Sequence, residues 1–285
     1  MPELPEVETT IRDLRPRVIG RTFKWVEIGV PRMVRAPSPE AFKDSLPGRS
    51  IKDAQRRGKF LIFPLDRGAF VVHLMMGGAL LSLTPGPDVK MVAEGVDVPW
   101  MGRDPAKYTR LRFGLDDGTE LWLVNPRTLG GVWLVDDAEQ IVGHLGPEPL
   151  DPSFTSQRLA ERLKGRTSPI KPVLLDQQVI AGIGNIYVDE SLFLAGISPE
   201  RPADELKPAE IKRLHASILA ALNRGLDFRG TSLGDFVTPN GVAGQHQTQL
   251  NVFRRGGEPC PKCGTPIRRM MFRGRGTHFC PKCQT

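Results

Sequence analysis

The chain has 285 residues, of which 40% are hydrophobic and 25% charged, a composition typical of a folded globular protein. Its length exceeds that of one average domain, so we expect two domains and a small appendage. Apolar runs stay well short of the roughly 20 residues that cross a bilayer, and the acidic start MPELPEVETT does not resemble a signal peptide. The sequence therefore predicts a cytoplasmic protein without a membrane partner.

The first residues predict an amphipathic helix. Val7, Ile11, Leu14 and Val18 recur at helical spacing, and acidic residues occupy the early turn, where the helix dipole favours them. We expect an interruption near Pro16, because proline removes a helical hydrogen bond.

Between residues 22 and 135, short apolar runs alternate with turns rich in glycine, proline and aspartate. The expected strands are 23–28, 60–63, 70–73, 79–83, 111–115, 120–124 and 132–135. A proline-rich stretch at 146–152 follows, after which the apolar period becomes helical. The prediction is an α+β multidomain protein: an antiparallel β-sandwich flanked by helices (1–145), a linker (146–152), a helical domain (153–250) and a terminal module (251–285). The polar, aperiodic segment 230–249 is long enough to be a functional or mobile loop.

The excess positive charge lies at the C-terminal end. Residues 251–285 hold eight basic side chains and one acidic one, so this segment accounts for the whole net charge of +7. A compact basic module on a neutral body is typical of phosphate contact, although a solvated basic tail would have the same composition.

All four cysteines lie in this basic segment, as Cys260-Pro-Lys-Cys263 and Cys280-Pro-Lys-Cys283. Two CxxC pairs at this separation fit a tetrahedral zinc site with four thiolate ligands. Two disulfides are the alternative, which an expected cytoplasmic location disfavours. We therefore predict one structural Zn²⁺ per chain.

Four separate segments resemble the bacterial formamidopyrimidine-DNA glycosylases, which remove 8-oxoguanine and ring-opened purines. They are the start Met1–Thr9, the triplet Gly58-Lys59-Phe60, the stretch from Ile170 to Phe193, and the four-cysteine finger. The resemblance covers nearly the whole chain, and it implies a helix-two-turn-helix within the helical domain.

The resemblance implies four catalytic residues. Once Met1 is removed, Pro2 becomes a secondary amine that can attack the anomeric carbon and form an iminium. Glu3 is then the general acid/base, with Glu6 in support; Lys59 supplies a proton or a phosphate contact, and Arg275 serves a second elimination. From the residues alone, Pro2 would simply start a helix, the two acids would stabilise the helix dipole, and Lys59 would be a solvated charge.

The remaining candidates are implied DNA contacts. Asn185 follows the turn Gly182-Ile-Gly184 at a helix start, where a phosphate or a plain N-cap would fit. Tyr108 and Arg166 fall at two further contact positions. The residues implied to fill the gap left by a flipped base are Met76, Arg127 and Leu129; core packing is the alternative for Met76 and Leu129.

Three features depart from the family pattern. Leu129 replaces the usual phenylalanine and loses base stacking, a histidine-rich stretch reads Lys107-Tyr-Thr-Arg110, and Gln245-His246 stands where an aromatic often appears.

The resulting hypothesis is a monomeric base-excision repair enzyme for damaged double-stranded DNA. It would act on oxidised purines as a bifunctional DNA glycosylase and AP lyase, by β,δ-elimination through a Schiff base on Pro2, with loop 230–249 covering the lesion. An endonuclease VIII-like glycosylase for oxidised pyrimidines and a non-catalytic lesion-binding protein are the alternatives.

Overall fold

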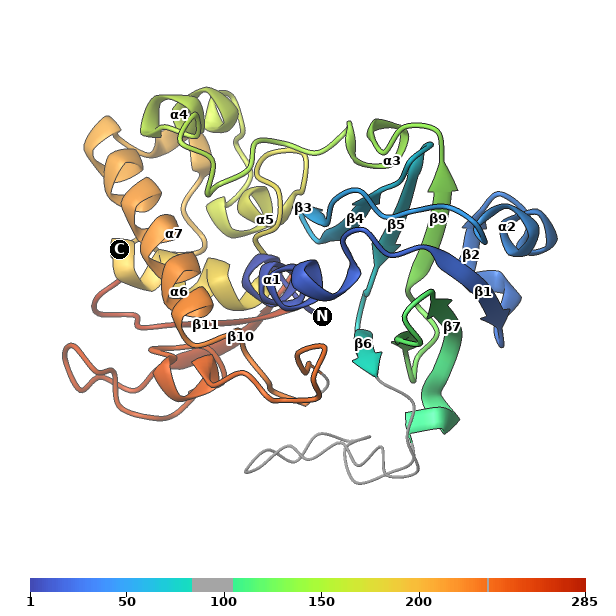
Figure 1. Ribbon diagram of the computed structural model, residues 1–285. Coiled ribbons are helices and arrows are strands. Elements are labelled where there is room, and N and C mark those ends of the chain that lie inside the picture. The colour runs from blue at the N-terminus through green and yellow to red at the C-terminus, as the bar shows by residue number, and fades with distance from the viewer. Residues whose placement is uncertain (84–104, 235) are drawn as a thin grey trace. The chain divides into compact units, whose positions relative to one another are not determined.

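The computed structural model describes residues 1–83, 105–234 and 236–285 (Figure 1). Its α-helices are α1 (Leu4–Val18), α2 (Pro39–Ser45), α3 (Glu139–Val142), α4 (Ser156–Leu163), α5 (Ile170–Leu175), α6 (Asn185–Ala195) and α7 (Pro208–Asp227). Its strands are β1 (Phe23–Ile28), β2 (Val34–Ala36), β3 (Gln55–Arg57), β4 (Phe60–Pro64), β5 (Ala69–His73), β6 (Ala79–Leu83), β7 (Thr109–Leu115), β8 (Glu120–Val124), β9 (Gly131–Val135), β10 (Arg268–Phe272) and β11 (Arg275–Phe279). Four 3-10 helices are η1 (Pro31–Met33), η2 (Pro105–Tyr108), η3 (Ala203–Glu205) and η4 (His246–Gln249).

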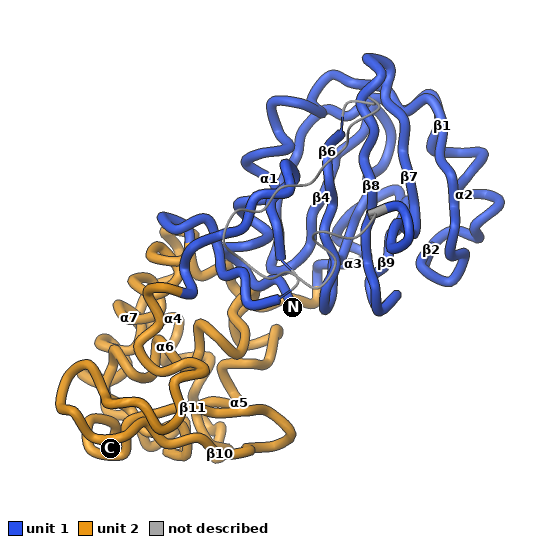
Figure 2. Tube along the Cα trace, turned by 90° about the horizontal axis from the view of Figure 1, so that it is seen from below, with its two compact units in different colours: residues 1–143, 226–247 blue, residues 144–225, 248–285 orange. Residues whose placement is uncertain are grey.

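The described chain forms two compact units, coloured separately in Figure 2. The first contains residues 1–143 and 226–247, and the second contains residues 144–225 and 248–285. Most of the expected loop 230–249 thus groups with the N-terminal unit, and residue 235 of that loop lies outside the described residues. The expected domain boundaries stay a prediction.

The N-terminal unit is a sandwich of two sheets, with strand orders β1-β7-β8-β6 and β2-β9-β5-β4-β3. Its core contains apolar side chains from both sheets, including the ring cluster of Phe23, Phe63, Phe70 and Phe113. The seven expected strands are all present. One pairing departs from the antiparallel expectation, because β2 runs parallel to β9.

Helix α1 buries the predicted apolar stripe in this core and contacts β3 and β4. It begins with a capping box between Glu3 and Glu6. The predicted interruption at Pro16 is wrong, because α1 continues to Val18 with Pro16 inside it. Pro16 lies in the last turn of α1 and has no N–H to donate to the preceding turn. The helix loses this one hydrogen bond and ends two residues later, at Val18.

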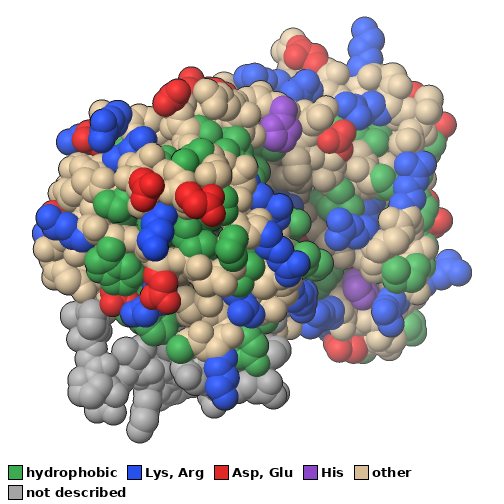
Figure 3. All heavy atoms as spheres, turned by 90° about the vertical axis from the view of Figure 1, so that its right-hand side faces the viewer, with side chains coloured by type: hydrophobic (Ala, Val, Ile, Leu, Met, Phe, Trp, Pro, Cys, Tyr) green, Lys and Arg blue, Asp and Glu red, His purple; other side chains and the backbone are tan. Residues whose placement is uncertain are grey.

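The second unit contains α4 to α6, most of α7, and the hairpin of β10 and β11, in agreement with the predicted helical period. Phe193 of α6 packs against Val252, Ile267 and two of the cysteines, which seats the finger on this helix. Within the described ranges, no helix is long and apolar enough to cross a membrane. On the face shown in Figure 3, acidic and basic side chains lie interspersed.

Candidate active site and nucleic-acid interface

The start of α1 is buried and held by hydrogen bonds. Pro2 is buried, and Glu3 and Glu6 are 4% and 1% exposed. The Glu3 N–H donates to Glu6 Oε2 over 2.8 Å, and the Thr231 N–H donates to Glu6 Oε1 over 2.7 Å. The part of the expected loop that belongs to the N-terminal unit, residues 230–247, is called the 230–247 loop below. One carboxylate therefore joins the predicted general acid/base, through its backbone, to the first residues of this loop.

Lys59 lies in the turn between β3 and β4 and is 6% exposed, so it is not the solvated charge that its surroundings in the sequence suggest. Phe60 pairs with His73 on β5, and the two rings meet edge to face, 4.4 Å between centroids. Burial, and secondarily the charge of Lys59, lowers the pKa of His73 to about 4. A second positive charge beside Lys59 is therefore disfavoured in this buried part of the N-terminal unit.

The turns that carry Met76 and Leu129 are adjacent. The Asn125 side chain is fully buried and donates from Nδ2 to the Leu74 carbonyl over 3.0 Å, which links the β8–β9 turn to the β5–β6 turn. A Cβ on Gly130 would lie 2.7 Å from the His73 carbonyl oxygen, so the close approach requires glycine. Met76 and Leu129 are 39% and 40% exposed, an arrangement that favours the gap-filling role over core packing.

Arg127 lies in the same turn as Leu129, and Tyr108 is tied to it through the backbone. Asn125 N–H donates to the Tyr108 carbonyl over 2.9 Å, while the Tyr108 side chain packs against a cluster that includes Leu81 and Val237. Four predicted DNA-contact residues therefore occupy one part of the N-terminal unit.

The second unit brings Asn185 and the Arg275 region together. Gly276 follows Arg275, and its carbonyl accepts hydrogen bonds from Asn185 Nδ2 at 2.9 Å and Lys171 Nζ at 3.0 Å. Gly184 is the N-cap of α6, so Asn185 is not the plain cap that its position also suggested. Arg275 is exposed at the start of β11.

Arg166 follows α4 and belongs to the same unit, but it has a different environment. It is half-exposed and forms a 3.5 Å ion pair with Asp176.

Sequence reasoning gave no role to three buried charges of the second unit. Lys171 and Asp189 form a 2.6 Å ion pair with side chains 1% and 0% exposed. Glu190 accepts hydrogen bonds from the backbone N–H groups of residues 251, 252 and 253 at 2.9 to 3.0 Å. The sequence indicates these buried charges only by placing charged residues inside an otherwise apolar helical pattern. Charged residues are rarely buried without partners, so this pattern predicts ion pairs or hydrogen bonds.

The four cysteine sulfurs lie within 4.8 Å of one another. Cys260 and Cys283 Sγ atoms are 3.9 Å apart, and those of Cys263 and Cys280 are 3.6 Å apart. A tetrahedron with zinc–sulfur bonds of about 2.3 Å has edges of about 3.8 Å, so these side chains fit one zinc ion. Zinc bound there would cross-link the two ends of the finger.

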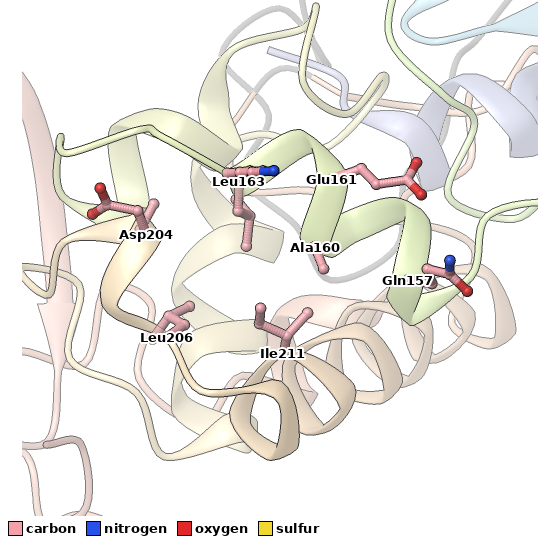
Figure 4. Close-up of a pocket in the computed structure, with 9 residues that line it drawn as sticks. Gln157, Ala160, Glu161, Leu163, Asp204, Leu206 and Ile211 are labelled. Carbon is pink, nitrogen blue, oxygen red and sulfur yellow. The ribbon is translucent and has the colours of Figure 1, made fainter.

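A separate pocket lies in the second unit, beside α4 (Figure 4). Leu163 points toward Leu206 and Ile211, and Glu161 points away from them. None of the predicted site residues line this pocket, so it has no part in the site.

Comparison with known proteins accounts for most of the chain. Residues 1–132 match the formamidopyrimidine-DNA glycosylase N-terminal domain, residues 145–237 match the H2TH domain of the same enzymes, and residues 257–285 match a zinc finger found in FPG and IleRS. The formamidopyrimidine-DNA glycosylase of Symbiobacterium thermophilum is 45% identical over 288 residues, covering 100% of this chain and 89% of that protein. The Brevibacillus brevis enzyme of the same name is 44% identical over 290 residues, covering 100% and 99%.

Solved structures agree with these matches. The crystal structure of MutM (Fpg) from Thermus thermophilus is 39% identical, with a TM-score of 0.84 and coverage of 99% of this chain and 98% of that one. Lactococcus lactis Fpg in complex with DNA containing an abasic site is 34% identical, with a TM-score of 0.85 and coverage of 99% of each chain. The chain belongs to the formamidopyrimidine-DNA glycosylase family.

The environment of His73 predicts a specific titration. Its folded-state pKa of about 4 lies below the ordinary value of 6.5, so its stabilising contribution is present above pH 6.5 and is lost as the pH falls through 4. Lys59→Met should raise the pKa of His73, yet keep it below 6.5, because burial is the larger cause. NMR titration, assigned with His73→Asn, measures both values; an unchanged pKa in Lys59→Met would contradict the proximity of the two groups.

We predict that removal of zinc lowers the affinity of the protein for DNA. We expect chelation to release one zinc per chain and to weaken binding to duplex DNA by roughly tenfold or more at moderate salt, because the basic finger loses its fixed shape. Metal analysis and fluorescence anisotropy measure these effects, and restored zinc should restore the affinity. Zinc release with unchanged DNA affinity would count against a role for the finger in binding.

Proposed function

We propose that this chain releases oxidised purines from duplex DNA with Pro2 as nucleophile and then cleaves the strand at the abasic site. As a member of its family, the chain is a DNA glycosylase with AP lyase activity. The observation that carries the proposal is the full-length match to these enzymes, together with a buried Pro2–Glu3 start of α1.

The nucleophile requires removal of Met1, because the nitrogen of an internal proline is an amide. In the processed chain the Pro2 amine attacks C1′ of the damaged nucleotide, and the bond between C1′ and the base breaks. Opening of the sugar ring, with a proton from Glu3 to O4′, leaves an iminium between Pro2 and C1′. The iminium then acidifies the C2′ proton.

Strand cleavage follows by elimination. Removal of the C2′ proton expels the 3′ phosphate, and a second elimination expels the 5′ phosphate. We assign the second step to assistance by Arg275, and we assign proton supply or phosphate contact near the base to Lys59. Glu6 holds the Glu3 backbone and so keeps the acid/base in place.

The damaged base must leave the stack before it reacts. We assign Met76, Arg127 and Leu129 to the space that it vacates, and their support is the adjacency of the two turns that carry them. An exposed apolar side chain inserted between bases compensates part of the lost stacking.

Backbone contacts hold the duplex in this proposal. We assign Asn185 and Arg275 to phosphate contact, because Asn185 Nδ2 donates to the carbonyl of Gly276, the residue that follows Arg275, and we assign further contacts to Arg166 and Tyr108. The basic finger adds affinity that falls with salt. One chain carries every group that the reaction uses, so we propose a monomer that acts on chromosomal DNA in the cytoplasm.

An endonuclease VIII-like enzyme is a weaker candidate, since the relatives named above are formamidopyrimidine-DNA glycosylases or Fpg proteins. A non-catalytic binding protein would bind the same DNA without forming a covalent adduct, which separates it from the enzyme.

The N-terminus provides the decisive test. A chain processed to Pro2 should form a borohydride-trapped adduct with abasic duplex DNA, while a chain that retains one residue before Pro2 should lose trapping by roughly a hundredfold or more, because its nitrogen is an amide. Intact mass verifies processing, and the same extension at the C-terminus is the control. Equal trapping by both chains would exclude Pro2 as the nucleophile.

Leu129 tests the gap-filling assignment. Leu129→Phe restores a ring that can stack on a base and should tighten binding to abasic duplex DNA by roughly tenfold, whereas Leu129→Ala should weaken it. Anisotropy with matched undamaged duplex separates lesion binding from general affinity. Identical affinities for all three proteins would remove Leu129 from the DNA interface.

A further inference from the structure

The loop at residues 230–247 is closed by a buried pair of polar side chains. Thr231 Oγ1 and His246 Nδ1 are 2.8 Å apart, and the two residues are 4% and 2% exposed. The His246 N–H also donates to the Gly230 carbonyl over 3.0 Å. Residues near the two ends of the loop therefore meet through both a side-chain and a backbone hydrogen bond.

This closure lies directly on the Glu6 carboxylate. The Thr231 N–H donates to Glu6 Oε1, and the other oxygen of Glu6 holds the Glu3 N–H. Gly230 has φ of +86°, and a Cβ at this position would lie 2.9 Å from Glu6 Cγ, so the loop starts in close contact with Glu6. His246 is thus two hydrogen-bonded steps away from Glu6.

The middle of the loop is fixed by other contacts. Ser232 Oγ donates to the Phe236 carbonyl at 2.7 Å and accepts the Gly244 N–H at 2.9 Å. The Pro239 carbonyl accepts the Ser82 N–H at 3.0 Å, on the edge strand β6. The described residues of the loop are therefore anchored at two places, at Glu6 and at β6, and the Thr231–His246 pair is part of the anchor at Glu6.

We propose that His246 is a positioning residue for base release, because its ring nitrogen fixes Thr231 and so holds the start of the loop on Glu6. This inference rests on the proposed function, in which the loop covers the flipped base. An aromatic hydrocarbon ring at position 246 could fill the same space but could not pair with the Thr231 hydroxyl. His246 therefore supplies a polar closure that a purely apolar side chain lacks.

The closure should matter for base release and not for strand cleavage. A preformed abasic site has no base for the loop to cover. The contact of Glu6 with the Glu3 N–H belongs to the capping box of α1, so we expect it to persist when the loop is loosened. Pro2 and Glu3 should accordingly keep their chemistry in proteins that lack the closure.

A double-mutant cycle tests this inference. His246→Phe and Thr231→Val should each slow single-turnover release of 8-oxoguanine by roughly five- to tenfold, as expected for one lost buried hydrogen bond, and the double variant should be no slower than the slower single variant. Thr231→Ser keeps the hydroxyl and His246→Asn keeps a polar atom near the position of Nδ1, so both should retain most of the rate. His144→Phe, at an exposed position, is the matched control.

Two further measurements separate the possible failures. Borohydride trapping on abasic duplex DNA should be unchanged in all of these variants, and amide hydrogen exchange should accelerate in residues 230–247 of His246→Phe while the β4 and β5 amides stay protected. Multiplicative losses in the double variant, equal losses in release and trapping, or an unchanged release rate would overturn the role of His246. Absence of trapping in the processed wild-type chain would instead overturn the proposed function.

Discussion

The carboxylate of Glu6 is the interaction on which the N-terminal site depends. It is 1% exposed, and its two oxygens accept N–H groups from two segments that are far apart in the chain, at Glu3 and Thr231. A buried carboxylate without such partners would be strongly destabilising, so both segments are held to it. The same interaction caps α1, orients the predicted acid/base and fixes where the loop begins.

A second constraint is the contact between the β5–β6 and β8–β9 turns. The Asn125 side chain donates to the Leu74 carbonyl, and the close approach at Gly130 leaves little freedom between the turns. Met76 and Leu129 project from turns that are individually short and mutually braced. Because the backbone of both turns is already fixed, only the two side chains would lose conformational freedom on DNA binding. The entropy cost of binding is therefore smaller than it would be for mobile turns.

Local pattern sufficed for much of the fold. Apolar runs bounded by turn residues predicted β1 and the strands from β4 to β9. The spacing of the cysteines predicted the zinc ligands. The short strands β2 and β3 were missed, because three residues carry no readable period and their pairing is decided by neighbours far away in the chain. Helix α1 likewise continues through Pro16 to Val18, whose side chain is buried, and the residues around Pro16 alone did not indicate this.

The site divides in the same way. Spacing alone located the cysteines, whereas Pro2, Glu3 and Lys59 depended on resemblance, because a single proline, acid or lysine has many ordinary uses. Neither route indicated the partners of Glu6, since the hydrogen bond to Thr231 joins residues with no shared local pattern. The roles of Asn125 and Lys171 were hidden for the same reason.

The buried Lys171–Asp189 pair has a consequence for how the finger is placed on α6. Asp189 also accepts the His278 N–H at 2.9 Å, and Lys171 reaches the Gly276 carbonyl, so the pair grips alternate residues of β11. Sliding the hairpin along the helix would leave a charge buried and unpaired, which is far more costly than the pair is favourable. The ion pair therefore contributes little to the binding energy between the hairpin and α6. It allows only one register of the hairpin along the helix, and so it fixes the position of Arg275 at the start of β11.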